Sequence, residues 1–238
     1  MGAKNKPLRV CLVIPAYNEA KVIGDVIAES AKALKSTPYS TEIVVVNDAS
    51  KDATATIAAK HGATVINHIL NSGAGGATAT GLSYAQQNRF DVACTMDADG
   101  QHEIVDVIKG IHLLTSQGSD LLIGSRLINS KGMSRVKVLG NKGLSFITYI
   151  LFGVHSTDSQ SGLRIFSAKT LKQLHWKTNG YEFCSEMLWR AKQLNLAIDE
   201  YPIKAIYTEY SKAKGQNNWN AVNIIKSLLL RRLTEMFE

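Results

Sequence analysis

Short runs of consecutive apolar residues alternate, over the first half of the chain, with segments whose apolar positions recur every three or four residues. Uninterrupted runs are typical of strands covered on both faces, and the periodic segments are typical of helices. We predict helices beginning near residues 22, 53, 77 and 104, and strands over residues 9–15, 42–46, 63–67, 90–94 and 120–125. This alternation predicts an α/β fold with a mostly parallel sheet flanked by crossover helices.

The pattern changes after residue 126. Residues 131–142 are basic and have the composition of a flexible segment, whereas residues 143–154 are apolar enough for a core or interfacial helix. Further along we predict a polar loop entering a strand (157–166), a helix (181–194), a strand (197–207), a basic loop (210–216) and a last helix (about 219–237).

The last helix carries apolar residues along one side, with Lys226, Arg231 and Arg232 beside them. Two interpretations stay open: it packs on the body of the domain, or it lies as an amphipathic helix on an anionic membrane. Because no repeat or low-complexity linker interrupts the chain, we predict one domain over residues 8–216, extended by a C-terminal amphipathic helix over residues 217–238.

Polar residues follow the predicted strands at the ends that a parallel sheet brings to one edge. Asp97 and Asp99 come after one strand, Asp48 after another, and Tyr17 and Glu19 after the first. Side chains two residues apart on an extended chain point the same way, so Asp97 and Asp99 can reach one point. Such a pair suits a hard divalent cation, although a solvated turn is the alternative.

A glycine-rich segment, residues 71–76, precedes the helix expected from residue 77. It is not a phosphate-binding P-loop, because no Gly-Lys-Ser/Thr sequence follows it. The small residues instead favour close packing of the helix, or of a nucleoside, against the backbone.

Composition places the 238-residue chain among soluble globular proteins, with 45% hydrophobic and 20% charged residues. The three cysteines form no CxxC pair, and we find neither a signal peptide nor an apolar run of the ~20 residues that a membrane-spanning helix needs. We therefore expect a cytoplasmic protein. Its net charge of +7 is uneven, since residues 121–157 contain five basic residues and no acid. Such a segment attracts phosphates, nucleic acid or an anionic membrane surface.

Taken together, four segments resemble the family 2 glycosyltransferases of GT-A fold, a Rossmann-like architecture. They are Val13–Glu19, Val46–Asp52, Asp97–His102 and Gly124–Arg126, in this order and at suitable spacing. Gln101, His102 and the segment 158–164 resemble the dolichyl-phosphate mannose synthase branch. That branch transfers a hexose from a UDP- or GDP-sugar to a polyprenyl phosphate such as undecaprenyl or dolichyl phosphate, with inversion at the anomeric carbon.

The resemblance implies roles for individual residues. The nucleotide sugar would be held by Pro15, Tyr17, Glu19, Asp48, Asp97, Asp99 and Gln101; Mg²⁺ or Mn²⁺ by Asp97, Asp99 and Gln101; and the acceptor phosphate by Ser125, Arg126 and Arg135. Catalysis would rest on Asp99, Arg126 and Asp158, the last of which orients a substrate or caps the turn at Gly162.

Two departures from the family pattern concern donor binding. Residues 71–75 lack the basic residue that many relatives carry there, and residues 210–216 lack an arginine. Lys212 or Lys214 would then neutralise the donor diphosphate. The chain also lacks the C-terminal membrane helices of some relatives, so we expect peripheral contact with the cytoplasmic membrane or with a membrane partner protein.

Two other hypotheses remain. The same fold would act on a saccharide hydroxyl in surface-polysaccharide synthesis if Asp158 served as catalytic base. Alternatively the chain is a non-enzymatic basic module that binds membrane surfaces. We expect no nucleic-acid partner, because the acidic residues at the strand ends repel a polyanion and no binding motif is present.

Overall fold

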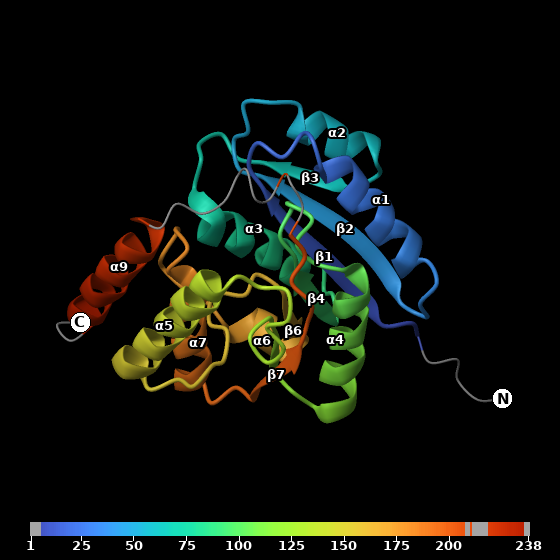
Figure 1. Ribbon diagram of the computed structural model, residues 1–238. Helices are drawn as coiled ribbons and strands as arrows, with labels where there is room; N and C mark the ends of the chain where they lie inside the picture. Colours follow the sequence, from blue (N-terminus) through green and yellow to red (C-terminus); the bar gives the residue numbers. More distant parts are fainter. Residues whose placement is uncertain (1–5, 208–209, 211–218, 236–238) are drawn as a thin grey trace.

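The computed structural model describes residues 6–207, 210 and 219–235. A single seven-stranded sheet in the order β3-β2-β1-β4-β6-β5-β7 forms its centre (Figure 1). Only β6 runs against its two neighbours, β4 and β5. The strands are β1 (Arg9–Ala16), β2 (Ser40–Asn47), β3 (Thr64–Asn67), β4 (Val92–Thr95), β5 (Leu121–Ser125), β6 (Arg164–Ser167) and β7 (Ile198–Pro202).

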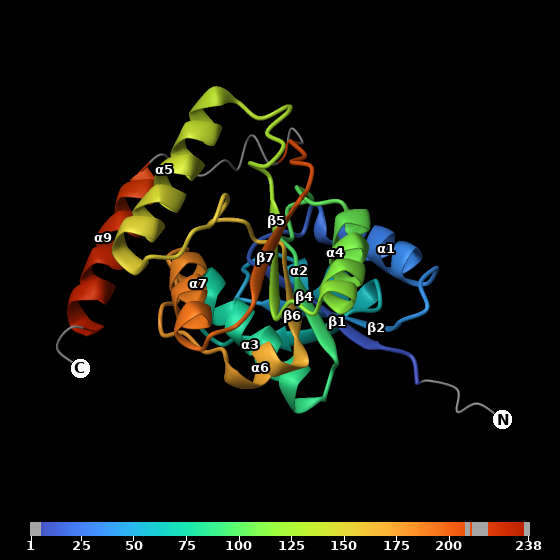
Figure 2. The same cartoon turned by 90° about the horizontal axis from the view of Figure 1, so that it is seen from below.

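Helices cover both faces of the sheet (Figure 2). One face packs on α1 (Ile23–Leu34), α2 (Thr54–Lys60) and α4 (Ile104–Gln117). The other packs on α3 (Gly73–Gln87), α5 (Arg135–Phe152), α6 (Ala168–Gln173), α7 (Phe183–Gln193) and α9 (Trp219–Glu235). Because both faces are covered, the central strands are apolar on both sides, and all of Val92–Thr95 is buried. The predicted α/β architecture is confirmed.

Strand direction decides where the polar strand ends meet. β1, β2 and β4 pair in parallel, and β5 points the same way because the antiparallel β6 separates it from β4. The carboxyl ends of these four strands therefore lie at one edge of the sheet, as predicted. The loop that enters β6 reaches the same edge, since β6 begins where the others end.

Three sequence-based boundaries differ from the structure. Residues 131–142 are not wholly flexible, because α5 begins at Arg135, where the Ser134 hydroxyl accepts a hydrogen bond from the amide of Lys137. Helix α3 begins at Gly73, so its first turn contains most of the glycine-rich segment. The predicted strand 197–207 ends at Pro202, which cannot donate a ladder hydrogen bond.

The last helix, α9, packs on the domain through one side and contacts α5. Ile224 and Leu228 are buried in the core formed with α5 and α7. Arg231 reaches the buried carboxylate of Glu186 on α7, with Nε 3.1 Å from Oε1. The packing interpretation of this helix is thus confirmed. Its amphipathic character and the boundary at residue 216 remain predictions.

Candidate functional site

Four loops converge at the carboxyl edge of the sheet: those that follow β1, β2, β4 and β5. The loop after β4 is tied to β1, because the amide of Met96 donates to the carbonyl of Val13 at 3.1 Å. The amide of Asp48 donates to the carbonyl of Ala16 at 2.9 Å. Parallel pairing therefore places the Asp97–Gln101 segment between the loop carrying Glu19 and the loop carrying Arg126.

Asp97 and Asp99 are held in different ways. His102 Nε2 lies 3.0 Å from Asp97 Oδ2, and Asp97 is half-exposed while the imidazole is buried. Asp99 accepts the amide of Gln101 at 3.0 Å, and the side-chain Nε2 of Gln101 donates to its second oxygen. Because Nε2 is directed at Asp99, the amide oxygen of Gln101 remains an acceptor for another group.

The electrostatics of this pair suit a divalent cation. Desolvation and then the charge of Asp97 raise the pKa of Asp99 to about 6. Desolvation also works against ionised Asp97, but the hydrogen bond from His102 and the charges of Arg126 and Arg164 lower its pKa below the ordinary value. Carboxylate and amide oxygens are the ligands that Mg²⁺ and Mn²⁺ prefer, and a cation would relieve the repulsion between the carboxylates.

The donor set would be incomplete without a substrate. Within the described ranges, no group of three or more His, Cys, Asp or Glu side chains is arranged to hold a metal. A cation at Asp97, Asp99 and Gln101 would therefore take its remaining ligands from water or from the oxygens of a bound diphosphate. The residues fit a metal that is shared with substrate.

Asp48 lies at the predicted edge, but its carboxylate is already engaged. It is almost fully buried and accepts hydrogen bonds at 2.8 Å from the amides of Ser72 and Gly73, and it lies 2.8 Å from Nδ1 of His68. These contacts outweigh desolvation and lower the pKa of Asp48. The carboxylate therefore fastens the N-terminus of α3 to the end of β2. Its predicted contact with the nucleotide remains a prediction.

The glycine-rich segment packs closely, as predicted. A Cβ on Gly75 would lie 2.6 Å from the carbonyl oxygen of Thr178, and one on Gly73, whose φ is +84°, would lie 2.5 Å from that of Asn179. A Cβ on Gly81 would collide with Val13 of β1. These glycines let α3 approach both the sheet and the 178–179 segment.

The end of β1 contributes a buried acid. Glu19 is almost fully buried, its amide donates to the Thr54 hydroxyl at 2.8 Å, and Oε2 accepts from the Tyr210 hydroxyl at 2.7 Å. Tyr17 is 40% exposed at this edge, and Pro15 is the residue before Ala16 in β1. Lys212 and Lys214, the predicted diphosphate partners, lie outside the described residues.

Arg126 and Asp158 form the basic half of the site. Nε and Nη2 of Arg126 lie 2.7 and 2.9 Å from the two oxygens of Asp158, which is fully buried. Although desolvation opposes its charge, this ion pair raises the pKa of Arg126 above its ordinary value. Within the described part of the chain, Nη1 of Arg126 has no hydrogen-bond partner, so it is the atom left for an anion.

The other two predicted acceptor residues differ in exposure. Ser125 is fully buried and its hydroxyl lies 2.6 Å from that of Thr157, so its present contacts support the neighbouring loop. Arg135 is exposed in the first turn of α5. Neither position excludes the predicted role, and both roles remain predictions.

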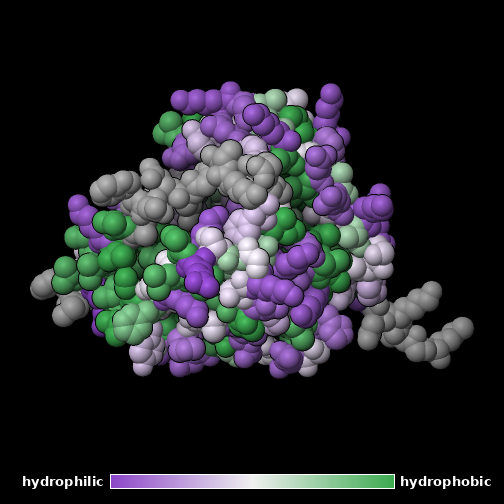
Figure 3. Space-filling model, in the orientation of Figure 1, coloured by the Kyte–Doolittle hydropathy of each residue, from purple (hydrophilic) through white to green (hydrophobic). Residues whose placement is uncertain are grey.

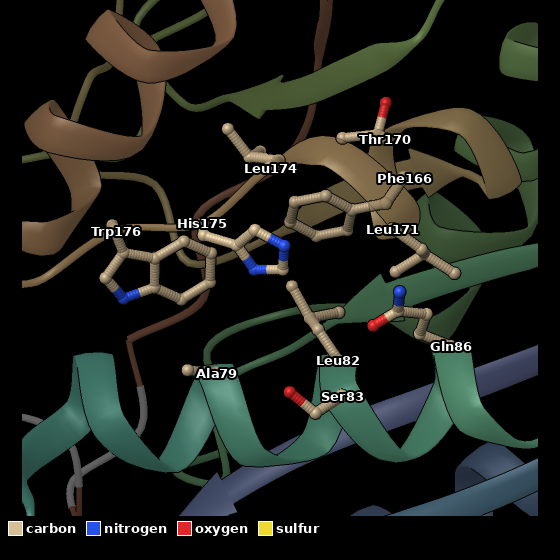
Figure 4. Close-up of a pocket in the computed structure, with 10 residues that line it drawn as sticks. All are labelled: Ala79, Leu82, Ser83, Gln86, Phe166, Thr170, Leu171, Leu174, His175 and Trp176. Atoms are coloured by element: carbon tan, nitrogen blue, oxygen red, sulfur yellow. The ribbon is translucent and has the colours of Figure 1, made fainter.

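Two hollows of the surface differ in their distance from Asp97 and Asp99. One of about 260 Å³ lies between α1 and the start of α4, with His102 and Gly100 in its wall. A smaller one of about 50 Å³ lies between α3 and α6, where His175 is seen between Trp176 and Phe166 (Figure 4). Phe166 pairs with Ala93 and Leu121 near the starts of β4 and β5, so this second hollow is remote from Asp97.

Comparison with known proteins identifies the fold and the family. The model of glycosyl transferase family 2 matches residues 11–175, more than half of the chain. The chain is a family 2 glycosyltransferase. An uncharacterised protein of Methanocaldococcus jannaschii is 43% identical, over 94% of this chain and 92% of its own. A UDP-N-acetylglucosamine–dolichyl-phosphate N-acetylglucosaminyltransferase of Methanococcus voltae is 40% identical, over 96% and 98%.

Among solved structures, the glycosyltransferase resembles glucosyl-3-phosphoglycerate synthase of Mycobacterium tuberculosis in complex with Mn²⁺, UDP-glucose and phosphoglyceric acid. The TM-score is 0.71, with 19% identity over 94% of this chain and 79% of the other. At that identity the likeness establishes the GT-A fold alone. Within the described ranges, no helix of the glycosyltransferase combines the length and hydropathy needed to cross a membrane.

Sequence reasoning missed several residues that build this glycosyltransferase site. It assigned no function of its own to His102, which orients Asp97, or to Tyr210, which reaches Glu19 from far along the chain. It also missed that Gly162 packs against the Asp97 carboxylate and that Arg164 is a buried brace. The segment 158–164 did carry a sequence signal, because a charged residue between Leu163 and Ile165 is unexpected in a buried strand.

Arg164 holds the loop that carries Asp158. Its guanidinium donates to the carbonyls of Ser161 and Ser159 at 3.0 and 2.8 Å, and to the carbonyl of Cys184 at 3.1 Å. A Cβ on Gly162 would collide with the carboxylate of Asp97. The loop between α5 and β6 therefore joins the Asp97 side of the site to the Arg126 side.

Proposed function

We propose that this enzyme transfers a sugar of the hexose type from a nucleotide sugar to a polyprenyl phosphate, with Mg²⁺ or Mn²⁺ and inversion at the anomeric carbon. The observation that carries the proposal is that an acidic group and a basic group of side chains lie at the same edge of the sheet. Asp97 and Asp99 offer oxygen ligands for a cation and diphosphate, and Arg126, braced by Asp158, offers a guanidinium edge for a second phosphate.

The donor half would bind through the residues predicted from the motifs. A bound cation would stabilise the negative charge that develops on the departing nucleoside diphosphate. In this chain His102 orients Asp97, Gln101 orients Asp99, and the neighbouring Glu19 keeps the strand-end loop in place through Thr54 and Tyr210. The geometry of the two carboxylates is therefore set before any ligand arrives.

The acceptor half supports a phosphate as nucleophile. A phosphate monoester is already anionic at neutral pH, so it needs positioning rather than deprotonation. Arg126 presents Nη1 while its other edge is fixed by Asp158, and such a fixed guanidinium suits a phosphate oxygen. The acid-free segment 121–157, to which Arg126 belongs, also contains Arg135 and three lysines.

Transfer to a saccharide hydroxyl, the competing hypothesis, would require a base. Asp158 is the candidate, but its carboxylate is fully buried and both of its oxygens face Arg126. Both oxygens are directed at the guanidinium and away from solvent, so the carboxylate is not positioned to meet a substrate hydroxyl. The observation favours the phosphate acceptor.

The relatives guide the choice of substrates and location. The 40% identical protein of Methanococcus voltae is named for transfer of N-acetylglucosamine from its UDP derivative to dolichyl phosphate, so UDP-N-acetylglucosamine is the first donor to test. An acceptor of this type resides in a membrane, and we infer peripheral association of this chain with the membrane that holds it.

The test incubates the purified protein with UDP- and GDP-sugars, Mg²⁺ or Mn²⁺ and a short polyprenyl phosphate, and detects the lipid-linked sugar by mass spectrometry. Removal of the metal by EDTA should abolish the product. Arg126→Gln should abolish it too, whereas Arg9→Gln, at the far edge of the sheet where Arg9 contacts Asn88, should not. If none of the donors gives a lipid-linked product, the polyprenyl phosphate acceptor is wrong.

A further inference from the structure

Helices α5 and α9 pack against each other and both expose large apolar side chains (Figures 1 and 2). Figure 3 shows hydrophobic atoms gathered over the part of the surface where these two helices lie. We call the following residues the α5–α9 surface: Val136, Leu139, Phe146 and Ile150 of α5, which are 63–74% exposed, and Val222, Leu229, Leu230 and Leu233 of α9, which are 46–56% exposed.

These exposed residues form stripes that do not pack in the core of the domain. On α5 they recur at helical spacing on one side, while Leu144 and Phe152 face the core from the other. On α9 the inward residues are Ile224 and Leu228. Each helix is therefore apolar on two sides, and only one side is needed for packing. Exposed apolar patches of this kind mark sites of interaction.

The charges on the two helices of this surface are predominantly positive. Helices α5 (135–152) and α9 (219–235) together contain six basic residues and one acid, Glu235 at the end of α9. Arg231 is turned inward to Glu186, but Lys142 and Lys226 are exposed, and Arg135 and Arg232 are exposed beside them. An apolar face rimmed by lysine and arginine is complementary to a bilayer that carries anionic headgroups.

We propose that the α5–α9 surface lies on an anionic lipid bilayer and places the acceptor half of the site at the headgroup layer. A second copy of the chain is a poorer occupant. In a two-fold dimer through this face each helix pair would meet its own copy, so the six basic residues of each copy would oppose one another with Glu235, at the end of α9, as the one acid on the two helices. A bilayer buries the same apolar stripes and neutralises the charges.

The inference that this surface brings the acceptor half of the site to the lipid rests on the proposed function. The N-terminal end of α5 lies beside the acceptor half, since Lys137 Nζ is 4.2 Å from the ring centroid of Tyr207, and the charge of Arg126 acts on that tyrosine. Interfacial helices insert about 5–10 Å into the headgroup boundary. Docked in this way, the chain would hold Arg126 within reach of a lipid phosphate that stays in its bilayer.

The experiment is co-flotation of the full chain with vesicles of phosphatidylcholine, with and without phosphatidylglycerol, in the absence of nucleotide sugar and polyprenyl phosphate. We expect binding to the anionic vesicles that falls as salt rises. Phe146→Ser with Ile150→Ser should weaken it by at least about tenfold, because both side chains lose their apolar area in the lipid. The matched control is Val105→Ser, 57% exposed on α4 at the other face of the sheet, which should bind like wild type.

A second pair of variants tests the charges. Lys142→Gln with Lys226→Gln should weaken binding by roughly thirtyfold, about fivefold for each basic residue near an anionic surface. Lys32→Gln with Lys35→Gln, which removes two exposed lysines at the end of α1 on the opposite face, should leave it unchanged. All substituted side chains are exposed, so the melting temperature should stay constant.

Three results would overturn the proposal: no flotation of the wild type, flotation that the surface variants do not reduce, or a dimer that Phe146→Ser with Ile150→Ser converts to monomer while vesicle binding persists. Transfer to a short water-soluble polyprenyl phosphate separates this inference from the proposed function. Transfer without flotation rejects the docking surface alone, and flotation without transfer rejects the proposed function alone.

Discussion

Asp158 holds the guanidinium of Arg126 through two parallel hydrogen bonds, 2.7 Å from Nε to Oδ2 and 2.9 Å from Nη2 to Oδ1. The carboxylate also accepts the backbone amide of Arg126 at 3.1 Å. With three contacts to one residue, Asp158 fixes both the backbone and the side chain that we expect to meet the acceptor. The pair therefore ties the end of β5 to the loop before β6.

Replacing Asp158 by asparagine should therefore disable the enzyme by releasing Arg126. We expect transfer to fall by about 100-fold or more, with a raised KM for the acceptor, because a partly buried guanidinium without its partner is misplaced. Loss of one member of a buried pair should also lower the free energy of unfolding by about 3–5 kcal/mol. Steady-state kinetics and urea denaturation measure the two effects.

The control for this variant is Asp120→Asn. Asp120 pairs at 2.8 Å with Lys169, which is half-exposed at the opposite edge of the sheet, so its loss should cost little and leave transfer unchanged. A different result for Asp158→Asn, unchanged acceptor affinity with abolished turnover, would favour a catalytic base and hence a hydroxyl acceptor.

Removing the Asp99 carboxylate tests the metal prediction. Asp99→Ala should weaken metal-dependent binding of a nucleoside diphosphate by more than about 100-fold and leave the fold intact, because Asp99 binds no element of the core. Calorimetry with UDP and Mn²⁺, with and without EDTA, measures this. Asp25→Asn, an exposed acid on α1, is the matched control. Normal nucleotide binding by Asp99→Ala would remove the centre of the proposed mechanism.

The contact between Gly162 and Asp97 yields a sharper test of geometry. A methyl group at position 162 would collide with the Asp97 carboxylate, so Gly162→Ala should displace it from His102 and weaken Mn²⁺-dependent UDP binding by roughly tenfold. Gly140→Ala, whose added carbon would meet no atom within 4 Å, should bind normally and gain about 0.5–1 kcal/mol of helix stability. Unaltered UDP binding in Gly162→Ala would show that Asp97 tolerates movement and is not a ligand.

The ion pair between Glu186 and Arg231 of α9 should stabilise the protein less at acidic pH. Desolvation raises the pKa of this buried carboxyl, but the bonds from residues 177 and 178 and the charge of Arg231 lower it below the ordinary value of 4.5. A lowered folded-state pKa means that the stabilisation is complete above about pH 4.5 and is lost as the pH falls through the folded pKa.

Glu186→Gln should thus be less stable than wild type by about 3 kcal/mol near pH 7, and the difference should shrink in acid. Thermal unfolding of both proteins across this range measures it. Glu103→Gln, whose partner Lys204 is largely exposed, should change stability little at any pH. A gap between Glu186→Gln and wild type that stays constant with pH would assign the effect to packing rather than charge.

Local sequence patterns were sufficient to predict the strands of the sheet and the edge at which their carboxyl ends meet. The uninterrupted apolar runs predicted each strand from β1 to β5, and parallel order required that Asp48, Asp97 and Arg126 share one edge. They failed where tertiary packing overrides local propensity. Gly140 and the basic residues make residues 131–142 look irregular, yet α5 includes residues 135–142 because Leu144 and Phe152 anchor the helix in the core.

The sequence by itself determined the fold class and the family, and it yielded the prediction of which acids and arginines belong to the site, because strand period and motif spacing are local properties. Tertiary structure alone decided how those residues are held. Asp48 accepts hydrogen bonds from the start of α3, Asp158 holds Arg126, and His102 holds Asp97. The first two contacts join residues far apart in the sequence, and the third joins residues of one loop. It also decided that α9 is apolar on two sides, since only packing separates the buried stripe from the exposed one.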